Sequence, residues 1–287
     1  MAIDYNALKK GGFMRQKQKD YFSLRLRVAG GNLTAKQLAV IAGAAEKYGD
    51  GHVHLTSRQS VEIPFVNIKD VENIKSDLAA GDVEPGVSGP RVRTVTACQG
   101  SGICPSGCAE TLELAKELDD RYYGKELPHK FKFGITGCQN NCLKAEENDM
   151  GLKGVLKVKG ISEKCIFCGV CAKACRTNAI TIGDGKLSVN YGNCNNCGRC
   201  AKSCPKDAWD TESGYILSFG GLFGNSISKG RTLLPVITDH DTLIRVADAA
   251  VDFFVRHGKP SERFKFTIDR VGWDVFERTL KEAYCLP

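Results

Sequence analysis

Two short cysteine pairs organise this chain: Cys98-Gln99-Gly100-Ser101-Gly102-Ile103-Cys104 and Cys138-Gln139-Asn140-Asn141-Cys142. Four thiolates delivered from two separate turns can hold a cubane [4Fe–4S] cluster, which takes four cysteine ligands. The glycines beside these cysteines let the backbone fold closely around inorganic sulfide. The stretch from Thr96 to Leu143 therefore predicts an iron–sulfur cluster site.

A second cysteine-rich segment, residues 161–208, has a different composition. It contains two C-x2-C-x2-C-x3-C runs, a pattern typical of bacterial two-cluster ferredoxins, in which the fourth cysteine of each run binds the other cluster. The predicted ligands of one cluster are Cys165, Cys168, Cys171 and Cys204, and those of the other are Cys194, Cys197, Cys200 and Cys175. Arg176 stands where the pattern has proline, but the ligand set is complete. Zinc is the alternative for a lone C-x2-C pair, and two complete runs weigh strongly against it.

Composition excludes several classes of protein. The 14 cysteines of this 287-residue chain lie mostly in tight runs, which indicates metal thiolates rather than disulfides. The N-terminus lacks the apolar region of a signal peptide, and no apolar run approaches the roughly 18 residues of a membrane span. The net charge of +7 comes from scattered lysines and arginines, without the dense basic tract typical of nucleic-acid binding. We expect a cytoplasmic protein with no membrane span and no nucleic-acid partner.

The N-terminal region predicts an α+β layer. Residues 21–28 alternate as in a half-buried strand, and further strands are expected over residues 53–55 and 61–65. Thr34 and Gln37 predict a capping box at the start of a helix that runs through Lys47, and a second helix is expected over residues 71–79. The expected buried stripe of the first helix is Leu38, Ile41 and Ala45.

Two groups of basic residues each allow two interpretations, anion binding or a solvated surface position. Arg58 lies in the turn Leu55-Thr56-Ser57-Arg58-Gln59, which suits either anion binding or a solvated bend. A strand is predicted over residues 131–135, with Lys130 and Lys132 on one face and the two phenylalanines on the other. Two lysines that point the same way repel each other unless an anion lies between them; otherwise they are solvated lysines on an edge strand. The residues alone leave both readings open.

The α+β pattern resumes after the cysteine-rich segment. A strand is expected over residues 215–219, followed by a glycine-rich loop, and helices are expected over residues 243–254 and 273–284. The cysteine-rich segment is therefore predicted to be an insertion within a larger domain.

Taken together, these motifs resemble those of the sirohaem-dependent sulfite and nitrite reductases. The resemblance rests on the two cysteine pairs, the Leu127–Lys132 run, the Thr56–Gln59 turn and the Gly220-Gly221 loop. It implies an α+β fold with three domains: a ferredoxin-like half-domain (residues 1–88), a sirohaem and [4Fe–4S] domain (residues 89–160 and 209–287), and an inserted bacterial-type 2[4Fe–4S] ferredoxin domain (residues 161–208). The insert is similar to those of dissimilatory sulfite reductases and of the catalytic subunit of anaerobic sulfite reductases.

The resemblance also implies sirohaem and three [4Fe–4S] clusters as cofactors, and reduction of sulfite to sulfide by six electrons. Electrons would reach the insert from an external donor protein or flavoprotein subunit. Arg58, Arg93, Lys130 and Lys132 would surround the substrate. The implied ligands of the catalytic cluster are Cys98, Cys104, Cys138 and Cys142, of which Cys142 would also bridge to sirohaem. The other implied sirohaem contacts are Thr56, Gln59, Gly220, Gly221, Lys229 and Arg231.

One departure from the family bears on assembly. Single-chain assimilatory members contain two copies of the half-domain pattern, and each site takes its basic residues from one half and its cysteines from the other. This chain has one copy, so the resemblance implies a homodimer or higher homo-oligomer with shared sites. Two alternatives stay open: a sirohaem nitrite reductase, and an electron-transfer subunit without sirohaem. Cys108 and Cys285 have no assigned cluster role, although Cys108 lies close to Cys104 in sequence.

Overall fold

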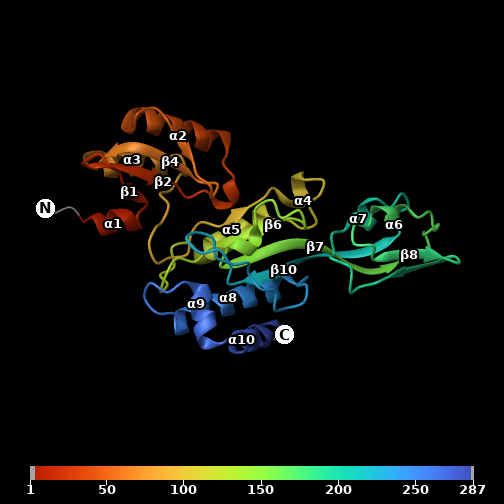
Figure 1. Ribbon diagram of the computed structural model, residues 1–287. Helices are drawn as coiled ribbons and strands as arrows, with labels where there is room; N and C mark the ends of the chain where they lie inside the picture. Colours follow the sequence, from red (N-terminus) through yellow and green to blue (C-terminus); the bar gives the residue numbers. More distant parts are fainter. Residues whose placement is uncertain (1–3, 286–287) are drawn as a thin grey trace.

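The computed structural model describes residues 4–285, and its N-terminal part is built on an antiparallel sheet (Figure 1). The sheet runs in the order β1 (Phe13–Arg15), β2 (Tyr21–Arg25), β4 (Val61–Asn67) and β3 (His54–Leu55). Helix α1 (Tyr5–Lys10) precedes β1, α2 (Ala35–Tyr48) packs on β4, and α3 (Val71–Ala79) packs on α2. One apolar core joins the sheet to α2 and α3.

Local signals in this part are confirmed with two corrections. The Thr34–Gln37 capping box is present, and α3 has the predicted bounds. The prediction for Leu38 is wrong, because its side chain is 51% exposed and the buried stripe of α2 begins only at Ile41. The alternation expected over residues 61–65 breaks at Phe65, which has a φ of 59° and lies where the β2–β4 register shifts.

The central body is built on a mixed sheet in the order β10 (Trp209–Phe219), β7 (Met150–Ile161), β6 (Phe133–Thr136) and β5 (Thr96–Ala97). The three strands β5, β6 and β7 are parallel, and β10 is antiparallel to β7. A single apolar core joins this sheet to its helices. These helices are α5 (Leu112–Tyr122), α8 (His240–His257), α9 (Phe264–Val271) and α10 (Trp273–Cys285).

The helices predicted at the C-terminal end are confirmed within α8 and α10. The strand predicted over residues 131–135 begins later, at Phe133, although Phe131 still bridges Val92. Phe131 and Phe133 are both fully buried. Phe131 packs against aromatic side chains of α8 and α9, and Phe133 packs against one of α5. Lys130 and Lys132 therefore lie on the other face. No helix within residues 4–285 is long and apolar enough to cross a membrane.

The cysteine-rich segment projects from the body as a separate unit (Figure 1). It joins the far end of the β7–β10 ribbon, where Ile161 pairs with Trp209. The unit contains α6 (Val170–Ala174), the hairpin of β8 (Ile180–Gly183) and β9 (Lys186–Val189), and α7 (Arg199–Lys202). The unit thus enters and leaves the body at neighbouring strand ends, and its assignment as an inserted two-cluster domain stays a prediction.

Polar contacts of Arg27 and Gln59 help to attach the N-terminal part to the body. Arg27 forms ion pairs with Glu84 and, on α5, with Asp119 and Asp120, at 2.7–2.9 Å. Gln59 donates to the carbonyl of Ala97 and accepts from its N–H, at 2.9 and 3.0 Å. The contact with Ala97 fixes the Arg58 turn beside β5. Ala97 is the last residue of β5 and directly precedes Cys98.

Candidate functional site

Five basic side chains gather around one buried carboxylate at the start of the parallel strands. Asp149, directly before β7, is fully buried and accepts hydrogen bonds from Arg263 at 3.0 and 3.2 Å and from the Lys132 N–H at 2.9 Å. Arg58 donates to the side chain of Asn148 at 3.2 Å. The predicted substrate residues Arg58, Arg93, Lys130 and Lys132 thus come together with Arg263, and we call these five the basic cluster.

The charges of this cluster are poorly compensated. Burial and the charges of Arg58, Arg263 and Lys130 lower the pKa of Lys132 to about 8, against the opposing effect of Asp149. Burial and neighbouring arginines lower the pKa of Arg58 and that of Arg93 to about 10. Burial and nearby cations also lower the pKa values of Lys130 and His129. Several cations that depress one another's pKa around a single carboxylate form a site suited to a small oxyanion.

Both arginines of the predicted set are held in fixed positions. Arg58 also donates to the carbonyl of Thr94 at 2.9 Å, and Arg93 donates to the carbonyls of Val87 and Gly89 at 3.0 Å. Sequence reasoning missed Arg263 and Asp149, because neither lies in a motif and they are joined only by tertiary structure.

The cysteine pairs lie at the other end of the same strands. Cys98 follows β5, and Cys138 lies two residues beyond the end of β6. The Cys98 sulfur accepts a hydrogen bond from the Gly137 N–H at 3.0 Å, an interaction that stabilises a thiolate. Cys142 is exposed and Cys138 is buried.

The strand length separates these two sites within one chain. Lys132 precedes β6 and Gly137 follows it, so at ~3.3 Å per residue their Cα atoms are about 17 Å apart. Arg93 and Cys98 have the same sequence separation across the β5 segment. The basic cluster and the cysteines of one chain therefore lie at opposite ends of the sheet.

The glycine-rich loop lies against the Cys142 segment. Gly230 donates to the carbonyl of Glu146 at 2.9 Å, and a Cβ on Gly221 would collide with that same oxygen. Lys144 stacks over Phe223 of the loop at 5.8 Å. Phe223, Ile227 and, beside Cys104, Ile103 are large apolar side chains left exposed. Lys229 and Arg231 are exposed on the same loop, and Arg231 stacks on Trp273 at 4.2 Å.

Two residues predicted to contact sirohaem have their side chains engaged elsewhere. The Thr56 hydroxyl accepts hydrogen bonds from the N–H groups of Arg58 and Ser60, at 3.3 and 3.1 Å. Gln59 uses both ends of its amide on Ala97. The local role of both side chains is to shape the turn that carries Arg58 and to fix it against β5.

The inserted unit contains two small cavities, each lined by four cysteines. Cys165, Cys168, Cys171 and Cys204 line one cavity, and Cys175, Cys194, Cys197 and Cys200 line the other. The two halves repeat a contact: the Ala179 N–H donates to the sulfur of Cys175 at 3.2 Å, and the Ala208 N–H donates to that of Cys204 at 3.4 Å. Within residues 4–285, no three His, Cys, Asp or Glu side chains group closely enough to hold a single metal ion.

Two known protein families match this chain in sequence. Residues 88–285 match the family described as "Nitrite and sulphite reductase 4Fe-4S domain", and residues 14–81 match "Nitrite/Sulfite reductase ferredoxin-like half domain". The chain therefore belongs to the nitrite and sulphite reductase family.

Relatives with assigned names include several sulfite reductases. The coenzyme F420-dependent sulfite reductase of Methanocaldococcus jannaschii is 33% identical over 95% of this chain and 44% of its own length. One subunit of the anaerobic sulfite reductase of Salmonella typhimurium is 32% identical over 63% of this chain and 58% of its own length. This chain thus spans about half the length of these two relatives.

Solved structures share the fold. The structure titled dissimilatory sulfite reductase I has a TM-score of 0.74 at 22% identity, and covers 91% of this chain and 69% of its own. The NirA protein of Mycobacterium tuberculosis has a TM-score of 0.70 at 19% identity, and covers 98% of this chain and 47% of its own. A mixed α/β fold with a ferredoxin-like half-domain is thereby established.

Proposed function

We propose that this protein is a sirohaem-dependent sulfite reductase, which reduces sulfite to sulfide with six electrons. The observation that carries the proposal is the basic cluster: five cations around one carboxylate, in a chain of this family. The relatives named as sulfite reductases support sulfite over nitrite, and the match to the anaerobic enzyme supports the same choice.

The residues of the basic cluster have distinct tasks in this proposal. Arg58 and Arg93, fixed by backbone carbonyls, hold the oxyanion with multiple donors. Lys132 and Lys130 have lowered pKa values, so they can give up protons as each sulfite oxygen leaves as water. The cluster also neutralises charge on the oxyanion while its S–O bonds break.

The chain also fits the proposed sirohaem. Phe223 and Ile227 are exposed on the loop that contacts residues 144–146, and Ile103 is exposed beside Cys104, as expected for a surface that a macrocycle covers. Lys229 and Arg231 on the neighbouring loop are suited to its carboxylates, with Gly220 and Gly221 shaping that loop. Thr56 and Gln59 would act through the position of their turn. When bound, sirohaem supplies the redox-active iron at which sulfite is reduced.

Three [4Fe–4S] clusters are proposed. Cys98, Cys104, Cys138 and Cys142 hold the first, and the two four-cysteine cavities of residues 161–208 hold the others. The two complete four-cysteine runs favour iron–sulfur clusters over zinc. The domain bounds proposed are 1–88, 89–160 with 209–287, and 161–208.

The separation along β6 supports shared sites. Because the basic cluster and the cysteines of one chain lie about 17 Å apart at opposite ends of a strand, each site is completed by a second protomer. We propose a homodimer, or a multiple of it, located in the cytoplasm. It receives electrons from an external donor protein or flavoprotein subunit.

Anaerobic absorption spectra and iron analysis of the purified protein test this function. We expect a reduced-porphyrin band that shifts when sulfite is added, and twelve cluster irons plus one sirohaem iron per chain. Absence of this band would contradict the proposal of a sirohaem enzyme and would favour an electron-transfer subunit without sirohaem. Turnover with reduced viologen on sulfite and on nitrite, as separate substrates, then distinguishes the two reductases.

Substitution of Lys132 by arginine tests its proton-donor role. Free wild-type enzyme should lose kcat/KM for sulfite as pH rises through about 8, because Lys132 loses its proton there. Lys132→Arg keeps its charge, so the KM should stay low at higher pH, while kcat falls about 100-fold for want of a proton donor. Sulfite's own ionisation is common to both proteins and serves as the internal reference. An unchanged pH profile in the variant would contradict the assignment.

A further inference from the structure

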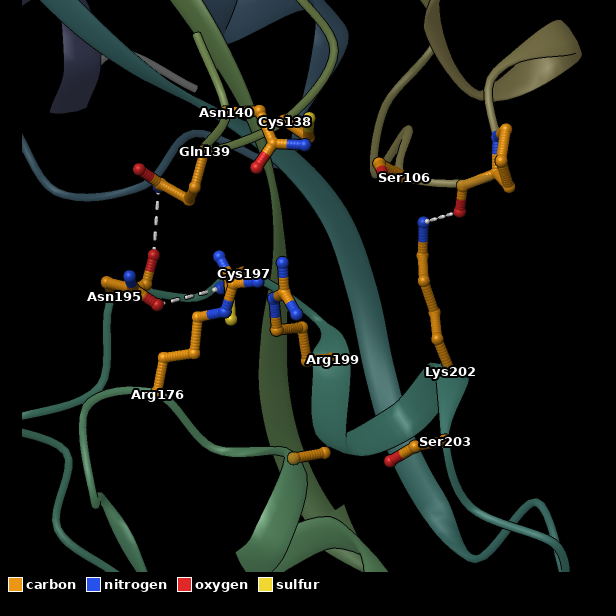
Figure 2. A pocket seen from close by; sticks show the side chains of 12 residues that line it. Ser106, Cys138, Gln139, Asn140, Arg176, Asn195, Cys197, Arg199, Lys202 and Ser203 are labelled. Atoms are coloured by element: carbon orange, nitrogen blue, oxygen red, sulfur yellow. Dashed lines mark hydrogen bonds between the residues drawn. The ribbon is translucent and has the colours of Figure 1, made fainter.

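Arg176 and Arg199 extend into one open cleft between the inserted unit and the body (Figure 2). The cleft has a volume of about 380 Å³, and no acidic side chain lines it. In Figure 2 both side chains reach toward Cys197. Among residues 4–285, neither guanidinium forms a hydrogen bond or an ion pair with the protein; Arg176 is exposed and Arg199 is half-buried. Two cations that line one cleft without an acidic neighbour raise the electrostatic potential there, which stabilises negative charge beside them.

The cleft lies between two loops that carry cluster cysteines. Cys138 of the body and Cys197 of the inserted unit both line it. Gln139 donates to the carbonyl of Asn195 at 2.9 Å, and Lys202 donates to that of Pro105 at 2.9 Å. The buried Cys108 thiol, left unassigned above, donates to the carbonyl of Cys197 at 3.3 Å. Residues 195–202 are thus the part of the unit bonded to the cysteine loops of the body.

The other four-cysteine cavity has no such attachment. Its lining, which includes Cys165, Cys168 and Cys204, comes from the inserted unit and from Trp209 at its junction with β10. The apolar Ile166 and Phe167 are exposed beside these cysteines. Of the two cavities, the one lined by Cys197 is therefore next to the body and the one lined by Cys168 is remote.

We propose that this cleft is the electron-transfer junction of the enzyme, and that Arg176 and Arg199 raise the reduction potentials of the two clusters that flank it. The inference rests on the proposed function. Each reduction adds one negative charge to a four-thiolate cluster, and a nearby cation stabilises that charge. The anionic clusters on both sides also relieve the repulsion between the two arginines.

The proposal fixes the order of transfer. A reduced external donor gives single electrons to the Cys165/Cys168/Cys171/Cys204 site. One electron at a time then passes to the Cys175/Cys194/Cys197/Cys200 site and across the cleft to the Cys98/Cys104/Cys138/Cys142 site. No bond is made or broken, and the donor supplies every electron. Arg176 and Arg199 are positioning residues that touch neither the substrate nor the reacting atoms.

Redox titration of the full-length protein, followed by electron paramagnetic resonance, tests the role of the arginines. In Arg176→Gln and in Arg199→Gln, the equilibrium constant for one-electron reduction of the two junction clusters should fall about tenfold, equivalent to 59 mV. The remote cluster, identified by the altered signal of a Cys168→Ser variant, should keep its potential. Lys186→Gln removes the same charge from the exposed start of β9 and should shift none of the three.

Unshifted junction potentials, or equal shifts of all three clusters, would overturn this inference. Calorimetry with inorganic phosphate gives a second readout: binding that the arginine variants lose, with potentials unchanged, would make the cleft an anion site instead. Missing cluster signals in the wild-type protein would overturn the proposed function itself, so the two failures are distinguishable.

Discussion

A heterodimer of two inactive variants should recover about half of the wild-type activity, because one of its two shared sites is intact. One chain carries Lys130→Ala with Lys132→Ala, and the other carries Cys142→Ser. If each site takes its basic cluster from one chain and its cysteines from the other, one site contains both lesions and the second contains none. Co-expression with two different tags and tandem purification gives the heterodimer, and viologen-linked sulfite reduction measures it.

The reciprocal arrangement provides the control. A chain with all three substitutions, paired with a wild-type chain, should be inactive, because each shared site then has one lesion. If each chain formed its own complete site, the two results would be exchanged: no activity in the first heterodimer and about half in the second. Failure to isolate any heterodimer from an active, monomeric protein would also contradict shared sites. The expected difference, between about half of the wild-type activity and none, follows from the length of β6.

Asp149→Asn should lower the free energy of unfolding by about 3 kcal/mol, since it removes the carboxylate from a buried ion pair and leaves Arg263 uncompensated. The other cations of the basic cluster would add to the repulsion. At roughly 2–4 °C per kcal/mol for a chain of this class, the melting temperature should fall by about 6–12 °C. Scanning calorimetry of the purified protein measures the change.

A second substitution separates charge from packing. Arg263→Gln in the Asp149→Asn background removes the unpaired cation and should restore a large part of the lost stability. Asp252→Asn breaks an exposed pair with Lys125 and should change stability by no more than about 0.5 kcal/mol. A melting temperature for Asp149→Asn equal to that of the wild type would show that Asp149 does not balance the basic cluster.

Signals that the sequence carries locally were enough for part of the fold. The Thr34–Gln37 capping box needs only four neighbouring residues, and the amphipathic pattern of α8 repeats over five turns. The alternation of Lys130 to Phe133 placed the two lysines opposite the phenylalanines. Strand β7 was not predicted, because nearly every residue in its first half is buried and no alternation marks it.

Some residues of the candidate site were also predictable from local sequence, and others were not. Cysteine runs are readable because a cluster needs its ligands at fixed short spacings. Asp149 and Arg263 are 114 residues apart, and only the packing of α9 beside the sheet brings them together. The pairing of Gln59 with Ala97 likewise depends on how the half-domain meets β5. Long-range polar contacts of this kind leave no periodic trace in a sequence.

The β7–β10 ribbon determines how the cysteine-rich unit is attached to the body. Because Ile161 and Trp209 are paired antiparallel neighbours, the entry and exit points of the intervening unit lie about 5 Å apart. A tight turn of a few residues would close the same hairpin. A unit of a different size could therefore be placed between these two strand ends without changing the core of the body.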